Sequence, residues 1–171
     1  QNPGRAERAA ILWKLVLLTY ASLLVVAHAY LREIAFTGLW TVLFSLAVYL
    51  TYCVLYLLPV FLPLLAFNHI VSTRRAGRIC AKLRLPPGVL VYALAVAGFS
   101  AVLLFVFSDT IIYDIYGFHF NGFVWNLIFT KGGMESMGGD TSTFVSAALL
   151  VVGFFALETG FLFALLKIGA I

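Results

Sequence analysis

The sequence predicts an all-α polytopic membrane protein, a helical bundle with four transmembrane helices and an interfacial segment between spans three and four. The chain is 63% hydrophobic and only 11% charged, with a mean hydropathy of +1.06, which is far outside the range of soluble domains. Its apolar residues form long runs rather than the short alternation of a membrane β-barrel, so helices must satisfy the backbone in lipid. Residues 1–171 are expected to form a single transmembrane domain.

The first two spans follow from the length of the apolar runs. Residues 9–30 form the first, because about 20 apolar residues cross the hydrocarbon core. The second is predicted at residues 37–58, with a kinked extension to residue 67 caused by Pro59 and Pro63. A hairpin inside this run is rejected, since its middle holds no Gly, Pro, Asn or Asp to reverse the chain.

The connector after the second span is strongly basic and contains no acid. Its charged residues are Arg74, Arg75, Arg78, Lys82 and Arg84. The positive-inside rule places this connector, and with it both termini, in the cytoplasm. If the connector is helical, Arg74, Arg75, Arg78 and Lys82 are expected to bind anionic phospholipid headgroups. The alternative is that these residues only determine topology.

Spans three and four are predicted at residues 89–107 and 144–166. Glu158 lies inside the fourth span, where a carboxyl is costly unless it is paired or protonated. Lys14 lies at a similar depth in the first span, so we expect the two to form an intramembrane pair joining spans one and four. The alternative is that Lys14 snorkels to the headgroups and Glu158 finds another partner.

Residues 108–143 are expected to form an outer loop that lies partly along the membrane surface, because they mix aromatic, acidic and glycine residues. The residues in this loop that are expected to form a site are Asp109, His119, Asn121 and Trp125. His119 is interpreted as a hydrogen-bonded histidine that fixes the loop, with Asn121 as its candidate partner. The spacing of the acids does not put them on one helix face, so no metal site is predicted.

Two other patterns are interpreted as structural. Tyr49, Tyr52 and Tyr56 share one helical face, and an aromatic stripe of this kind is more often packing than a ligand site. The glycines of residues 131–140 indicate turns. Their exposed amides are an alternative site for an anion, although the spacing of a P-loop is absent.

The order of polar residues resembles a known family. Asp109, then His119-Phe120-Asn121 and Val124-Trp125-x-Leu127, followed by a span with Glu158, resembles the membrane domain of bacterial inner-membrane sulfatase-fold proteins. These include a lipopolysaccharide-regulating inner-membrane protein and, more distantly, lipoteichoic-acid synthases and phosphoethanolamine transferases. The resemblance covers residues 37–167.

The resemblance implies a five-helix membrane domain followed by a periplasmic domain of alkaline-phosphatase type, which in transferring members holds a metal and a Thr or Ser nucleophile. This chain departs from that plan, because it stops at Ile171 after a fourth span. No catalytic residue, metal or cofactor is therefore assigned to it. The outer loop 108–143 corresponds to a periplasmic loop.

The expected function is that of a membrane anchor and lipid-interacting domain of a sulfatase-like protein that acts on or senses phospholipid or lipopolysaccharide headgroups. The expected location is the bacterial inner membrane, and the partners are the membrane and a sulfatase-like domain rather than nucleic acid. The alternative is a self-contained membrane subunit that binds another membrane protein through tight Ala/Gly helix faces, such as Ala156, Gly160 and Ala164.

Overall fold

The structure, a computed structural model, describes residues 4–35, 37–73, 78, 80, 82, 84–133 and 141–168. The described elements are all helical, as predicted, and four of them are long and apolar enough to cross a membrane. In chain order the helices are α1 (Arg5–Ala27), the 3-10 helix η1 (His28–Glu33), α2 (Leu39–Val71), α4 (Pro87–Tyr116), α5 (Gly122–Phe129) and α7 (Thr141–Ile168).

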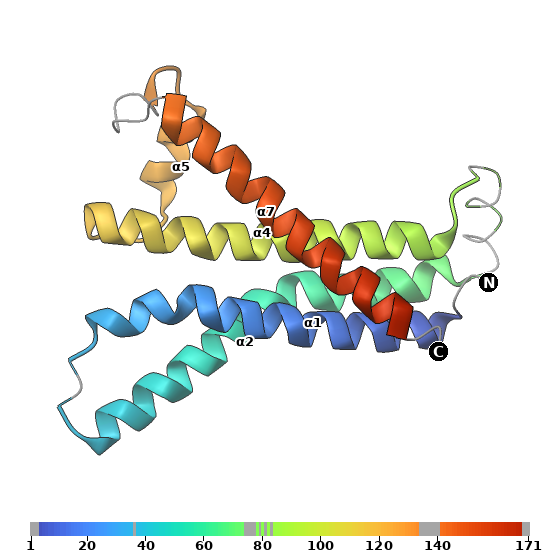
Figure 1. Cartoon of the computed structure of the whole chain (residues 1–171), viewed down its shortest axis with the longest axis horizontal. Coiled ribbons are helices and arrows are strands. Elements are labelled where there is room, and N and C mark those ends of the chain that lie inside the picture. The colour runs from blue at the N-terminus through green and yellow to red at the C-terminus, as the bar shows by residue number, and fades with distance from the viewer. Residues whose placement is uncertain are drawn as a thin grey trace.

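The four long helices run back and forth between two ends of the bundle (Figure 1). The start of α1 and the end of α7 lie at one end, which we call the terminus end. The short helix α5 lies at the opposite end, which we call the α5 end. It runs across the direction of α4 (Figure 1).

Helix α2 is one continuous helix that contains both Pro59 and Pro63. Each proline removes a backbone donor, and the ribbon changes direction along its length (Figure 1). The two halves pack differently. Towards the terminus end Leu57, Phe61 and Leu64 are buried, whereas most residues before Cys53 are exposed.

Helix α4, like α1, packs against all three of the other long helices. Phe99 and Leu103 are fully buried in its middle. The helix continues to Tyr116 rather than ending at residue 107, and it carries Asp109 within its last turns. Gly117 ends it in the left-handed conformation with φ of 72°, the usual role of glycine after a helix.

Polar contacts join the helices at the terminus end. Arg8 on α1 is buried, and its guanidinium donates to Asn68 Oδ1 at 2.8 Å and to Ser72 Oγ at 2.7 Å. The Asn68 amide in turn donates to the Arg5 carbonyl. These bonds fix the start of α1 on the end of α2, so the bundle is tied together at the end opposite α5.

Candidate functional site

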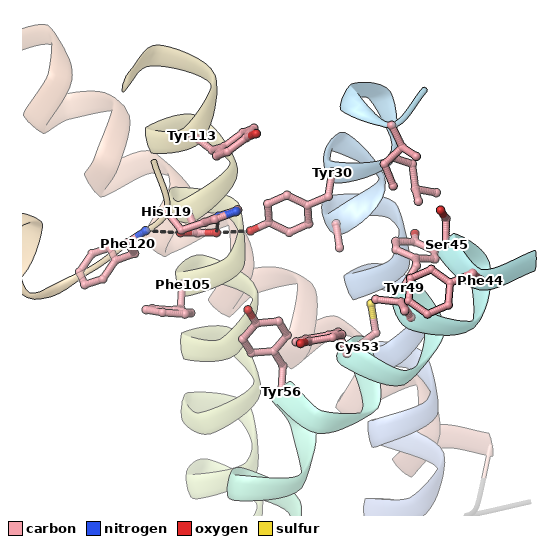
Figure 2. A pocket seen from close by; sticks show the side chains of 16 residues that line it. Tyr30, Phe44, Ser45, Tyr49, Cys53, Tyr56, Phe105, Tyr113, His119 and Phe120 are labelled. Carbon is pink, nitrogen blue, oxygen red and sulfur yellow. Dashed lines mark hydrogen bonds and ion pairs between the residues drawn. The ribbon is translucent and has the colours of Figure 1, made fainter. Parts of the chain in front are cut away.

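A cavity of about 680 Å³ lies at the α5 end, between α1 with η1, the first half of α2, the end of α4 and the segment before α5. We call it the α5-end cavity. Figure 2 shows Phe44, Ser45 and Tyr49 of α2 on one side and the cluster around His119 on the other. The lining is mostly aromatic and aliphatic, and five of the 16 lining residues are tyrosines.

Asp109 is the centre of the polar side of this cavity. It is only 5% exposed. Its Oδ2 accepts a hydrogen bond from the Tyr30 hydroxyl and contacts His119 Nδ1 at 2.9 Å. Its Oδ1 accepts from the backbone N–H of Phe120. Three donors from two segments of the chain, η1 and the segment before α5, therefore converge on one buried carboxyl group (Figure 2).

His119 is held by its ring as well as by Asp109. The ring stacks on Tyr113 with centroids 4.6 Å apart and an interplanar angle of 17°, and it meets Tyr30 edge-on at 5.6 Å. Its side chain remains 60% exposed. The contact with Asp109 takes Nδ1, so the other ring nitrogen is left for the surroundings.

Asn121 and Trp125, which were expected to share a site with Asp109 and His119, have different roles. Asn121 caps α5, since its Oδ1 accepts from the backbone N–H groups of Phe123 at 2.9 Å and Val124 at 3.2 Å. Trp125 is exposed, and its ring packs against Phe120. The structure therefore brings together only the acid and the histidine of the four.

The tyrosine stripe of α2 contributes to the same cavity. Tyr49, Tyr52 and Tyr56 all line it, and the Tyr49 hydroxyl donates to the Leu24 carbonyl of α1. Tyr56 directs its hydroxyl towards the Asp109 cluster (Figure 2). Sequence reasoning missed Tyr30, because nothing local marks a tyrosine at the end of a span as the partner of an acid 79 residues away.

The predicted basic lipid site is described only in part. Arg78 and Lys82 are both helical and exposed. Arg74 and Arg75 lie outside the described residues. The predicted binding of anionic phospholipid by these four residues stays a prediction.

The predicted pair between Lys14 and Glu158 is not formed. Both residues are described, yet Glu158 is completely buried and Lys14 is exposed, with no ion pair between them. Glu158 Oε2 instead accepts from Thr19 Oγ1 at 3.1 Å, and Oε1 has no protein partner. Helices α1 and α7 are neighbours, but at about 100° per residue Lys14 lies about 140° around α1 from Thr19.

This geometry predicts unequal effects for the two groups. Lys14→Met is expected to change the free energy of unfolding by less than about 0.5 kcal/mol, because the side chain is exposed. Glu158→Ala is expected to cost about 2 kcal/mol because it leaves a cavity at a completely buried position. Unfolding of both single variants and the double variant in detergent checks this. If the losses of the two single variants do not add up to that of the double variant, the two side chains interact, which would support the predicted ion pair.

In comparisons with known proteins, no family model, no curated protein and no solved structure matches this chain.

Proposed function

We propose that this chain is a membrane domain that binds one lipid in the α5-end cavity. The observation that carries the proposal is the arrangement of polar and apolar residues in the cavity's lining. A polar cluster around Asp109 and His119 faces a wall of apolar and aromatic side chains across about 680 Å³. An amphiphile needs this combination, with a few polar groups for its headgroup and apolar surface for its chains.

The position of the cavity supports entry from the bilayer. Phe44 and Tyr52 line it and are 71% and 56% exposed, so its α2 wall continues onto the lipid-facing surface of the bundle. Ser45, between them in sequence, is buried and also lines the cavity. A lipid chain can therefore lie along α2 while its headgroup reaches α4.

Filling the cavity tests the proposal. Ser45→Trp is expected to reduce the amount of phospholipid that copurifies with the chain by about fivefold, because the indole occupies space that the lipid needs. Ser146→Trp, at an exposed position of α7, is the matched control and is expected to retain the lipid of the parent. Native mass spectrometry of the purified chains measures the retained lipid. Equal lipid in both variants would exclude the cavity as the binding site.

The wider setting of the function follows the family resemblance. The domain would anchor a sulfatase-like periplasmic domain in the bacterial inner membrane and present phospholipid or lipopolysaccharide headgroups to it, with both termini in the cytoplasm. The exposed Arg78 and Lys82 support a second contact with anionic phospholipid on the cytoplasmic side.

A second candidate function is that of a subunit that binds another membrane protein. One observation favours it. The outward face of α7 carries a shallow apolar groove that contains Ala156 and Gly160, and small residues allow a second helix to approach closely. Cross-linking from a cysteine at position 156 in membranes would identify a partner helix there.

A further inference from the structure

The charges in the α5-end cavity are unlike those of a phosphate site. Among its lining residues, all of which the structure describes, Asp109 is the only acid and none is Lys or Arg. Proteins bind phosphate through arginine, lysine or several convergent N–H groups. The donors of Tyr30, His119 and Phe120 already point at Asp109, and the other side-chain donors of the lining are neutral Ser, Tyr and Cys groups. The cavity therefore offers a ligand a carboxylate acceptor and no lysine or arginine donor.

Asp109 retains capacity for one more donor. A carboxylate has about four accepting positions. Two bonds are received by Oδ2, from Tyr30 and His119, and one is received by Oδ1, from Phe120. About one position on Oδ1 remains. A hydrogen-bond donor that also carries a positive charge would fill that position and compensate the acid.

The rest of the lining suits a cation that is partly desolvated. Five tyrosines and three phenylalanines line the cavity. Tyr30 reaches across from η1 and Tyr56 points up from α2, on either side of the space beside Asp109 (Figure 2). Aromatic faces attract ammonium groups through the negative potential above the ring. The phenol oxygen of Tyr56 adds another acceptor.

We propose that the α5-end cavity selects an amphiphile whose polar end is a primary ammonium group. The N–H groups donate to Asp109, and the tyrosine rings surround the charge. An anionic headgroup at the same place is repelled by the carboxylate and finds few donors. This inference rests on the proposed lipid-binding function and adds the chemical class of the headgroup.

Probes with one common chain test the class in the unmodified protein. Dodecylammonium, dodecyltrimethylammonium and dodecyl phosphate are titrated onto the purified chain in neutral detergent, and native mass spectrometry counts the bound molecules. Dodecylammonium is expected to bind about tenfold more tightly than dodecyl phosphate, the effect of one charge-assisted hydrogen bond. The trimethyl probe, which has no N–H, is expected to lie between them. Equal or tighter binding of the phosphate overturns the proposal.

Asp109→Asn tests the residue, because it removes the charge and keeps the size of the side chain. It is expected to abolish the preference for dodecylammonium over dodecyl phosphate. Asp114→Asn is the matched control, since Asp114 is exposed on the same helix and does not line the cavity. Tyr56→Phe, which preserves the ring, is expected to weaken dodecylammonium about threefold and serves if Asp109→Asn does not fold. A preference that survives both cavity variants overturns the proposal.

Two further measurements separate the sources of failure. Butylammonium has the same headgroup without a long chain. If it binds as tightly as dodecylammonium, the ligand is a soluble amine rather than a lipid.

Ser45→Trp should weaken the binding of every dodecyl probe. If it does so while the probes show no preference for ammonium, lipid binding stands and the ammonium class is wrong. If it leaves all probes unchanged, the lipid-binding function itself is wrong.

Discussion

Asp109→Ala is expected to lower the free energy of unfolding by about 3 kcal/mol. The substitution leaves the Tyr30 hydroxyl, His119 Nδ1 and the Phe120 N–H without their common acceptor. Each unsatisfied donor that stays out of water costs about 1–3 kcal/mol. His119 is more than half exposed and regains water, so the partly buried donors of Tyr30 and Phe120 contribute most of the loss.

Unfolding by a denaturing detergent, followed by circular dichroism, measures this effect. Asp114→Ala is the control, because it removes an exposed acid from the same helix and is expected to stay within about 0.5 kcal/mol of the parent. Tyr30→Phe removes one of the three donors, and the double variant should lose less than the sum of the two single losses. Additive losses would show that Asp109 and Tyr30 do not act as a unit.

The class of the fold and the four apolar helices were predictable because hydropathy is a local property of the sequence. About 20 consecutive apolar residues mark a span whatever the span packs against. The ends of the spans were less predictable. Residues 108–116 were predicted to belong to the outer loop, because Asp109 interrupts the apolar run. In the structure α4 continues through them. Asp109 can lie in the helix because three donors from other segments satisfy its carboxyl group.

The partners of the polar residues could not be predicted, because they depend on rotation around helices and on contacts far apart in sequence. Similar depth in the membrane was the only reason to predict Lys14 as the partner of Glu158. The face of α1 that packs into the bundle carries Thr19 instead, and Lys14 lies off that face. His119 was correctly interpreted as a hydrogen-bonded histidine, but its partner is Asp109. Asn121, which is closer in sequence, caps α5 instead.

The second large effect is expected at Gly98 of α4, which lies directly against Val60 of α2. A Cβ atom at this position would lie 2.5 Å from Val60 Cγ1, whereas Gly153 on α7 has nothing within 4 Å. Val60 cannot turn aside easily, because a β-branched side chain in a helix has one strongly preferred rotamer. The contact lies in the packed half of α2, next to Phe61 and about one turn beyond Tyr56, the last α2 residue that lines the α5-end cavity.

Gly98→Ala is therefore expected to destabilise the bundle by about 2 kcal/mol relative to Gly153→Ala, since alanine would force α2 and α4 apart. The comparison with Gly153→Ala removes the intrinsic preference of a helix for alanine over glycine, about 1 kcal/mol. Val60→Ala removes the clashing methyl group, so Gly98→Ala combined with Val60→Ala should recover most of the steric loss. Unfolding of the four variants in detergent gives the coupling energy. If Gly98→Ala is as stable as Gly153→Ala, the close approach of the two helices at Val60 does not exist, and the α2 wall of the cavity must be positioned by other contacts.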